Sequence, residues 1–268
     1  MTTFLITGGA GSLGREIVSR LTNNTVRVLD IDEAGLSDLK DMHPDTRCLY
    51  GDIRDPNRCS LAMKGVEVCV HTAALKNINI TEFNVPELIN TNVTGTQNLV
   101  LAAIEQGVRH FIFVSSDKAV HPTTTYGTTK LLGENIVKWA GKIQNKTKFT
   151  IIRPGNFWKS KGNVFEVWEK QARQGKPLTL TNNMMIRYFI DTEDVAAMII
   201  GFAGEMQFAN TTIIPRMQRY LIAEELKNRY PRAEIKITGR REGEKDIEKL
   251  WADSEKIEDK GDHWEVKW

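Results

Sequence analysis

A glycine-rich turn near the N-terminus constrains the fold more than any other feature of the sequence. It follows a short apolar segment, from Thr3 to Thr7, and precedes a helical pattern that ends near Leu21. Glycines let a strand turn tightly, let backbone N–H groups approach a pyrophosphate, and let a helix pack closely on a sheet. The turn therefore predicts a dinucleotide-binding unit, whose expected cofactor contacts are Gly8, Gly11, Ser12, Leu13 and Gly14.

An acidic residue after the second strand favours NAD over NADP. The apolar segment from Val26 to Leu29 ends at Asp30, about 20 residues after the middle glycine of the turn. A carboxylate at this point can accept hydrogen bonds from the adenosine ribose hydroxyls, and it repels a 2′-phosphate. The alternative is that Asp30 only opens the turn that follows, since such motifs also occur by chance.

Strands and helices alternate along the first 153 residues. We expect helices near residues 35–42, from Pro56, and from about Val85 to Gln106, and further strands that end at Gly51, His71, Val114 and Arg153. This alternation predicts an α/β fold with a doubly wound parallel sheet of the Rossmann type. Gly95 lies inside the long helix, where glycine costs about 1 kcal/mol against alanine, which indicates close packing at that point.

The alternation breaks down after the sixth strand. Residues 154–185 contain a lysine-rich loop, a helix from about Val164 to Gln174 and irregular segments, and a helix from Thr192 to about Ala203 returns to the core. We expect a dinucleotide-binding domain at residues 1–153, with about 186–214 in its core. Residues 154–185 and 215–268 then form a small substrate-binding lobe, whose basic residues supply cationic partners for an anionic ligand.

Reactive side chains lie on both sides of a short polar segment after the fifth strand. Asp117 and Lys118 follow the carboxyl end of that strand, where open α/β sheets place their ligands. Thr125 can cap a helix that begins at about Tyr126, which places Lys130 one turn further along the same face. A nearby ammonium favours the phenolate and predicts a lowered pKa for Tyr126, whose ordinary value is about 10. The alternative is that the two residues only form an amphipathic helix face.

Composition excludes several classes of partner. With a net charge of +2, the chain gives no overall electrostatic reason to expect nucleic acid or an anionic membrane as a partner. The three cysteines are widely spaced, with no Cys-x-x-Cys and no histidine placed to make a metal-ligand cluster, which predicts reduced thiols in a cytoplasmic protein and no metal site. The N-terminus lacks the pattern of a signal peptide, and no apolar run reaches the ~20 residues that span a bilayer. The expected partner is a small molecule.

Six short motifs are more specific than the glycine turn: His71-Thr-Ala-Ala-Leu-Lys76, Thr91-Asn-Val-Thr-Gly-Thr96, Ser115-Ser-Asp-Lys-Ala-Val120, Tyr126-Gly-Thr-Thr-Lys130, Arg153-Pro-Gly-Asn156 and Arg241-Glu-Gly-Glu-Lys245. With them the chain resembles an extended short-chain dehydrogenase/reductase. More narrowly, it resembles the CapD-like UDP-N-acetylglucosamine 4,6-dehydratases of polysaccharide biosynthesis. The resemblance extends from Thr3 to about Leu250. An aspartate–lysine pair separates this group from the 4-epimerases and from dehydratases with an aspartate–glutamate pair.

The resemblance implies a role for each matching position. Tyr126 and Lys130 would perform the redox step with NAD and also contact it. Asp117 and Lys118 would perform the elimination, and Ser116 would hold the sugar hydroxyl. Further cofactor contacts implied are Asp30, Asp52, Ile53, Ala73, Ala74, Lys76 and Asn92. The implied contacts to the UDP-sugar substrate are Lys76, Asn156, Asn163, Arg187, Arg241 and Glu244. The family also implies a homo-oligomer, either a dimer or larger.

Four positions depart from the pattern of the group. The group often has a Ser-Arg pair, which suits NADP, where this chain has Asp30 and Ile31, so NAD stays the expected cofactor. Pro154 replaces a common tyrosine, and Glu242 replaces a proline. These two changes leave open the identity of the sugar and whether its C5 is inverted.

Two other functions remain compatible with the sequence. A UDP-sugar 4-epimerase or 4-ketoreductase on the same scaffold would need Tyr126 but would not need Asp117 and Lys118. A non-catalytic protein that senses dinucleotides could also have this fold, because a fold does not fix a function. The presence of both Tyr126 and Lys130 favours an enzyme.

Overall fold

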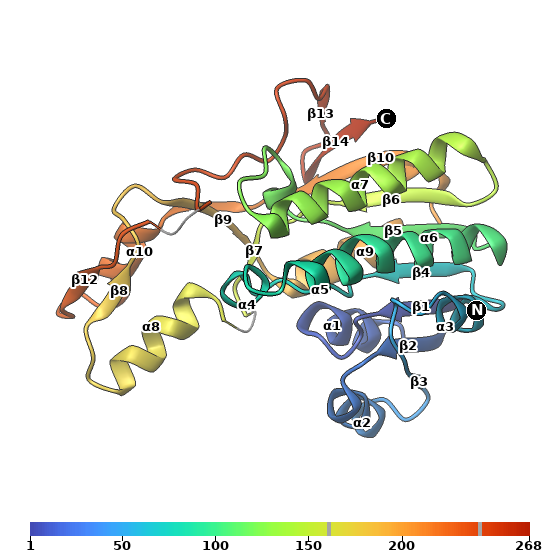
Figure 1. Ribbon diagram of the computed structural model, residues 1–268, viewed down its shortest axis with the longest axis horizontal. Coiled ribbons are helices and arrows are strands. Elements are labelled where there is room, and N and C mark those ends of the chain that lie inside the picture. The colour runs from blue at the N-terminus through green and yellow to red at the C-terminus, as the bar shows by residue number, and fades with distance from the viewer. Residues whose placement is uncertain (160–161, 241–242) are drawn as a thin grey trace.

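The computed structural model describes residues 1–159, 162–240 and 243–268. Among these residues, the largest element is a nine-stranded sheet that runs through the middle of the molecule (Figure 1). The strands lie in the order β13 (Ile257–Asp259), β14 (His263–Lys267), β10 (Thr211–Pro215), β6 (Lys148–Ile152), β5 (His110–Val114), β4 (Val68–His71), β1 (Thr3–Thr7), β2 (Thr25–Asp30) and β3 (Arg47–Tyr50). β1 pairs in parallel with both β2 and β4, so the direction of strand addition reverses beside β1. Open α/β sheets bind their ligands at such a point.

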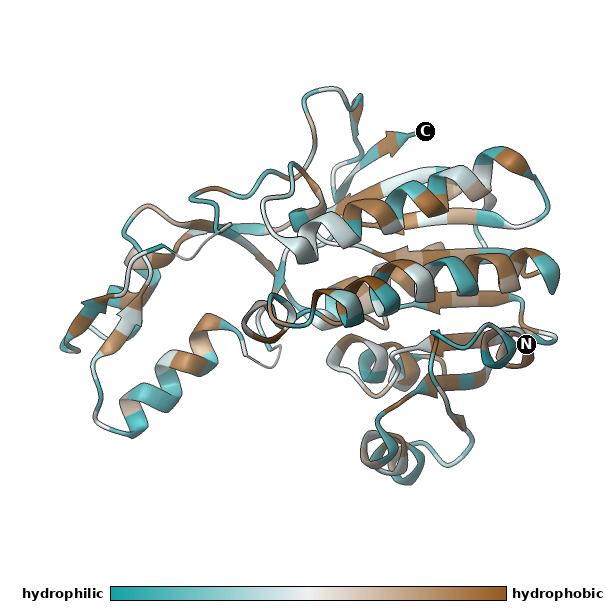
Figure 2. Cartoon of the chain, viewed as in Figure 1, coloured by the Kyte–Doolittle hydropathy of each residue, from teal (hydrophilic) through white to brown (hydrophobic). Residues whose placement is uncertain are grey.

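Helices cover both faces of the sheet. One face carries α1 (Ser12–Arg20), α2 (Glu33–Met42) and α9 (Thr192–Phe202), and the other carries α3 (Pro56–Met63), α6 (Gly95–Glu105) and α7 (Thr125–Ile143). All five residues of β5 are buried between the two resulting apolar cores, and Figure 2 shows apolar residues concentrated on the central strands. The predicted doubly wound α/β fold is confirmed. In the described part of the chain, the helices are all too short or too polar to cross a membrane.

The helix predicted from about Val85 to Gln106 is interrupted by a π turn. It consists of α5 (Val85–Ile89), the π-helix η1 (Asn90–Thr94) and α6. A Cβ on Gly95 would lie 2.7 Å from the Cδ1 of Ile53, which confirms the close packing expected at this glycine. The short α4 (Ile78–Thr81) was not expected, because four residues are too few to show a helical period.

A small lobe follows the end of β6. It contains a three-stranded sheet of β11 (Gln218–Leu221), β9 (Ile186–Ile190) and β7 (Asn156–Phe157), a two-stranded sheet of β12 (Ile235–Ile237) and β8 (Leu178–Leu180), and the helices α8 (Val164–Arg173) and α10 (Ile222–Arg229). Trp168 of α8 is fully buried, and its indole N–H donates to the Thr179 carbonyl at 2.8 Å. The lobe thus has an apolar core of its own.

The last strands return to the large sheet. β14 pairs antiparallel with β10, with Lys267 opposite Thr211, and β13 pairs with β14. We expected all of residues 215–268 in the lobe, but β13 and β14 belong to the large sheet. We expected β9 in the core of the first domain, but it pairs with strands of the lobe. Short strands with mixed polar and apolar residues do not indicate which sheet they join. The remaining division into two domains stays a proposal.

Candidate active site

A cavity of about 1120 Å³ opens at the carboxyl ends of β1, β2, β4 and β5. It extends from the glycine turn past Asp30 to Tyr126 and Lys130 of α7. The cavity is large enough for a dinucleotide, and it lies beside the reversal in strand order. Of the residues predicted to contact a cofactor, all except Asn92 line this cavity.

The glycine turn provides space because its residues lack side chains. Gly8 has a φ of 71°, and a Cβ there would lie 2.5 Å from the backbone nitrogen of Ala73. A Cβ on Gly14 would lie 2.4 Å from the Cα of Gly9. Gly11 precedes α1 and has no capping side chain, so the first N–H groups of this helix are left for another acceptor. This arrangement fits a pyrophosphate, which helix N-termini bind through their N–H groups and dipole.

Asp30 lies at the edge of the cavity with its carboxylate fixed by backbone groups. Its Oδ2 accepts a hydrogen bond from the N–H of Ala10 at 2.9 Å, and its Oδ1 accepts one from the N–H of Asp32 at 3.0 Å. Each oxygen keeps a further lone pair. The carboxylate can therefore accept additional bonds from hydroxyl groups of a ligand in the cavity.

Asn92 does not line the cavity, and its predicted contact with the cofactor stays a prediction. Its Oδ1 accepts from the N–H of Leu75 at 2.8 Å, and its Nδ2 donates to the Leu75 carbonyl at 2.9 Å and to Oγ1 of Thr129 at 3.1 Å. The π turn directs this amide toward the segment that follows β4. Asn92 thus holds Leu75, which lines the cavity. A match to a sequence motif cannot distinguish this role from direct contact with a cofactor.

The Asp117–Lys118 pair lies just beyond β5, as predicted. Asp117 is fully buried, and its Oδ1 accepts from the ammonium of Lys118 at 3.0 Å and from Oγ of Ser116 at 3.0 Å. Its Oδ2 has no hydrogen-bond partner among the described residues. Lys118 also donates to Oδ1 of Asn156 at 3.3 Å. Buried polar atoms without a partner are uncommon, so the free oxygen indicates a place for a ligand group.

The surroundings of Lys118 favour its charged form. Burial lowers the pKa of Lys118, but the charges of Asp117, Glu248 and Tyr126 and the hydrogen bond to Asp117 outweigh it, so its pKa lies above the ordinary value. Lys118 is therefore an ammonium at neutral pH in the resting protein. It must lose this proton before it can act as a base.

The helix that carries Tyr126 begins one residue earlier than predicted. Thr124, and not Thr125, is the N-cap of α7, and its Oγ1 accepts from the N–H of Gly127 at 3.1 Å. Both threonines suit this position, so the sequence alone could not separate them. Tyr126 and Lys130 still lie one turn apart, and both line the cavity.

The predicted lowering of the pKa of Tyr126 by Lys130 is wrong, because the pKa of Tyr126 lies above its ordinary value. Burial raises the pKa of Tyr126, and the charge that opposes this rise is that of Lys118, helped by a hydrogen bond from Ser116. The ammonium of Lys130 instead donates to the carbonyl of Val114 at 2.8 Å. Burial also lowers the pKa of Lys130 to about 8.

Lys76, Asn156 and Asn163, three of the predicted sugar-nucleotide contacts, lie in three places. Lys76 lines the large cavity, and Asn156 accepts a hydrogen bond from Lys118. Asn163 caps α8, where its Oδ1 accepts from the N–H of Glu166 at 2.9 Å. It lines a separate cavity of about 570 Å³ in the lobe. The structure thus brings Asn156 to the Asp117–Lys118 pair and Lys76 to the cofactor cavity, and it brings Asn163 to neither place.

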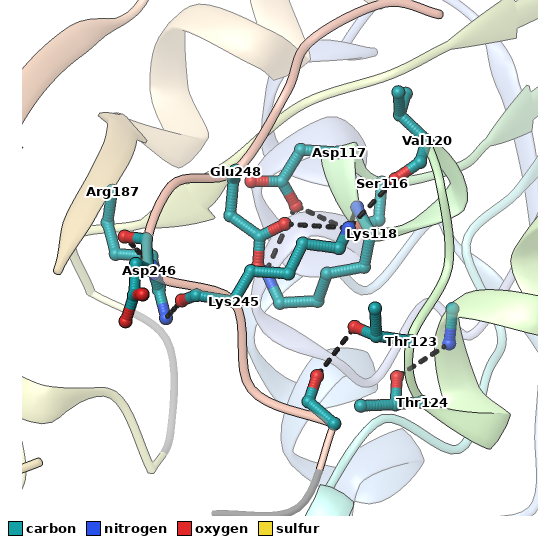
Figure 3. Close-up of polar contacts among 12 residues, drawn as sticks. Ser116, Asp117, Lys118, Val120, Thr123, Thr124, Arg187, Lys245, Asp246 and Glu248 are labelled. Atoms are coloured by element: carbon teal, nitrogen blue, oxygen red, sulfur yellow. Dashed lines mark hydrogen bonds and ion pairs between the residues drawn. The ribbon is translucent and has the colours of Figure 1, made fainter. Parts of the chain in front are cut away.

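The remaining predicted contacts belong to a C-terminal segment. Arg187 donates through Nη2 to the carbonyl of Lys245 at 2.8 Å and through Nη1 to that of Asp246 at 3.1 Å (Figure 3). Arg187 thus fixes the path of this segment. Glu244 is half-buried in it, and Arg241 lies outside the described residues. Substrate contact by these three residues stays a prediction.

We did not predict from the sequence a network of ion pairs that begins at Ser115, two residues before Asp117. Arg153 donates to Glu134 at 2.7 Å and to Glu255 at 2.9 Å, and Ser115 donates to Glu134 at 2.6 Å. Glu134 is fully buried in α7, one turn after Lys130. A carboxylate on the same helix face as a functional lysine was the available signal, because such a charge is rarely buried without a partner.

Three relatives share about a third of their aligned residues with the chain. An uncharacterized membrane protein of Methanocaldococcus jannaschii is 37% identical over 94% of this chain and 81% of its own length. The inverting UDP-N-acetylglucosamine 4,6-dehydratase of Campylobacter jejuni is 34% identical, over 90% of this chain and 75% of its own. The UDP-glucose 4-epimerase of Rickettsia bellii is 32% identical, over 98% and 82%. The chain is thus similar to proteins named for either reaction.

Solved structures show the same fold. Pen from Bacillus thuringiensis has a TM-score of 0.91 and 30% identity, over 99% of this chain and 88% of its own. DesIV, a dTDP-glucose 4,6-dehydratase from Streptomyces venezuelae solved with NAD and TYD, has a TM-score of 0.81 and 21% identity, over 93% and 88%. The family described as "Polysaccharide biosynthesis protein" matches residues 4–266. The resemblance predicted from the motifs is therefore confirmed, and the chain belongs to this polysaccharide biosynthesis protein family.

Proposed function

We propose that the protein is a nucleotide-sugar 4,6-dehydratase that converts UDP-N-acetylglucosamine to a UDP-4-keto-6-deoxy sugar for glycan precursor synthesis. The observation that carries this proposal is the buried Asp117 beside Lys118. An elimination needs an acid and a base at neighbouring carbons, whereas hydride exchange at C4 alone does not. The free Oδ2 of Asp117 can hold a proton for a departing hydroxyl. The similarity to a relative named as this dehydratase also supports the proposal.

The redox step uses the side chains at the start of α7. A nicotinamide bound in the cavity would supply the hydride chemistry at C4 and C6 of the sugar. The glycine turn and Asp30 would hold its dinucleotide. Tyr126 takes the proton of the C4 hydroxyl, assisted by the charge of Lys118 and the hydrogen bond from Ser116, which favour its phenolate. Lys130 and its contact to Val114 position this end of the cavity.

The elimination step uses the residues beyond β5. The 4-ketone formed in the first step makes the C5 proton acidic. Lys118 passes its own proton to Asp117 across their 3.0 Å contact and then removes the C5 proton, and Asp117 gives the proton it received to the C6 hydroxyl, which leaves as water. Ser116, whose hydroxyl already contacts Asp117, holds the sugar hydroxyl in place.

We propose NAD as the cofactor and not NADP. The support is the carboxylate of Asp30, which is fixed at the edge of the cavity by two backbone N–H groups. It accepts from the ribose hydroxyls, and its charge repels a 2′-phosphate.

A UDP-sugar 4-epimerase is the second candidate. One observation favours it: the chain is 32% identical to a relative named UDP-glucose 4-epimerase. That reaction would use Tyr126 in the same way. It would leave the acid and base of the Asp117–Lys118 pair without a task, which is why we place it second.

Incubation with UDP-N-acetylglucosamine, followed by mass spectrometry and separation of the products, distinguishes these functions. A product that has lost one water supports the dehydratase. A new isomer of unchanged mass overturns it in favour of the epimerase. An unaltered substrate, with bound dinucleotide present, overturns both in favour of a protein that only binds dinucleotides.

We also propose that two copies associate through α6 and α7. Leu132, Trp139 and Ile143 form an exposed apolar stripe along α7, and Leu101 of α6 is exposed beside it. Neighbouring helices with several large exposed apolar side chains are typical of protein contacts. Sedimentation should show a dimer or larger species that Trp139→Glu converts to monomer, and a monomeric wild type would contradict the proposal.

A further inference from the structure

The segment of residues 243–248, here called the strap, has a fixed path beside the Asp117–Lys118 pair. Oγ1 of Thr123 donates to the carbonyl of Gly243 at 2.6 Å. Gly243 has a φ of 74°, and a Cβ on it would lie 2.5 Å from the carbonyl oxygen of Thr123. Further along, Arg187 donates to the Lys245 carbonyl, and the N–H of Ile186 donates to the Asp246 carbonyl at 2.8 Å. The strap is therefore bound at both ends, to the loop before α7 and to β9.

The strap brings two charged side chains into the interior. The ammonium of Lys245 donates to the Val120 carbonyl at 2.8 Å and to Oε2 of Glu248 at 3.1 Å. Glu248 is only 5% exposed. Figure 3 shows both side chains directed toward Asp117 and Lys118. Neither of the two residues had a predicted role.

Two half-buried ammonium groups, of Lys118 and Lys245, and two buried carboxylates, of Asp117 and Glu248, thus lie close together beyond the end of β5. Lys118 contacts Asp117 directly at 3.0 Å, while Glu248 acts on it through space. The charged groups that act on Lys118 come from the end of β5, from α7 and from the strap: Asp117, Tyr126, Glu248 and the partner of Glu248, Lys245. Charges in a partly dry interior interact more strongly than in water. The charge of Lys118 therefore depends on Glu248, which is 130 residues further along the chain.

We propose that Glu248 is a positioning residue that controls the charge of Lys118, and through it the base of the elimination step. The role in elimination rests on the proposed dehydratase function, whereas the effect on the charge of Lys118 does not. Glu248 stabilises the ammonium form, so Lys118 keeps its proton to a higher pH. Lys245 partly offsets this effect, because it places a positive charge next to Glu248.

Competitive labelling of Lys118 with an amine-acylating reagent, measured by mass spectrometry over a range of pH, tests the proposal in the whole protein. The reagent reacts only with the neutral amine. In Glu248→Gln, the midpoint of labelling should move to lower pH, with about a tenfold larger neutral fraction at a given pH. In Lys245→Met the midpoint should move to higher pH, because Glu248 then acts unopposed.

Lys249→Met is the matched control. Lys249 is next to Glu248 in the chain, but its side chain is exposed and pairs with Asp253. Its loss should leave the midpoint unchanged. An unchanged midpoint in both Glu248→Gln and Lys245→Met would overturn the proposal. If Glu248→Gln does not fold, Lys245→Met alone decides, with a shift to higher pH in support and any other result against.

The pH profile of turnover separates this inference from the proposed function. Dehydration should fall at high pH as the Asp117–Lys118 pair loses the one proton that the elimination needs, and in Glu248→Gln this fall should occur at lower pH by the same amount as the labelling midpoint. Glu248→Asp should restore the wild-type profile. A purely structural role would lower the rate without moving the profile, which would overturn the inference. If the wild type forms no dehydrated product, the proposed function fails while the labelling result still stands.

Discussion

The cofactor cavity and the neighbouring site around Asp117 and Lys118, here called the cofactor side and the lobe side, are built from different kinds of groups. On the cofactor side, backbone groups and missing side chains shape the space, as at Gly8, where a Cβ would lie 2.5 Å from Ala73. On the lobe side, charged side chains from segments far apart in the chain meet at Asp117 and Lys118. A site made of backbone resists most substitutions, whereas a site made of paired charges responds to the loss of any one of them. Single substitutions should therefore separate the two sides.

The largest effect is expected at the buried network that supports the lobe side. Arg153→Met removes the hydrogen-bonded cation of fully buried Glu134 and half-buried Glu255 and leaves only Lys138, 3.8 and 3.9 Å away, near them. We expect the free energy of unfolding to fall by about 3–5 kcal/mol, measured by urea denaturation. Arg173→Met is the control, because the exposed pair of Arg173 with Glu169 should contribute less than about 0.5 kcal/mol. Equal losses in the two variants would contradict the proposed importance of the network.

Lys118→Met should lower the dehydration rate, which depends on the lobe side, without changing dinucleotide binding, which depends on the cofactor side. The side chain keeps its approximate length but loses its charge and its basicity. Dehydration should fall about 10²-fold or more, because the base for the C5 proton is gone. Dinucleotide affinity, measured by titration calorimetry, should stay close to that of the wild type. Loss of dinucleotide binding in this variant would show that the two sides are not independent.

Gly243→Ala tests whether the strap belongs to the lobe side. The φ of 74° and the 2.5 Å approach to Thr123 should together cost about 1–3 kcal/mol in stability. Gly175→Ala is the control, because Gly175 has a φ of 63° and nothing within 4 Å of its Cβ position. Thermal unfolding should therefore show a larger loss for Gly243→Ala. A loss no larger than that of Gly175→Ala would mean that the contact with Thr123 does not hold the strap.

Asp30→Ala should give the smallest effect, because it changes one side chain on a side built of backbone. It removes a ribose acceptor and a charge that repels a 2′-phosphate. The preference for NAD over NADP, measured as the ratio of dissociation constants, should fall about tenfold. Asp38→Ala, which removes an exposed carboxylate of the same cavity, should change the ratio less. A wild type that binds NADP more tightly would overturn the cofactor proposal.

The same contrast explains what could be predicted from the sequence. The strand, turn and helix around Gly8 are consecutive in the chain, so spacing alone predicted them, and the 2.5 Å contact that a Cβ on Gly8 would make with Ala73 agrees with the tight turn predicted there. The pKa of Tyr126 was wrongly predicted, because burial depends on everything packed around the phenol. Glu248 had no predicted role, because only the folded strap brings it to Lys118.

The fate of the C5 proton tests the central claim most directly. The protein is incubated with UDP-N-acetylglucosamine in D₂O, and the product is analysed by mass spectrometry and NMR. The account predicts loss of one water and incorporation of one deuterium at C5 by the wild type, and neither change with Lys118→Met. A product without solvent deuterium at C5, or near wild-type dehydration by Lys118→Met, would contradict the assignment of Lys118 as the base of an elimination.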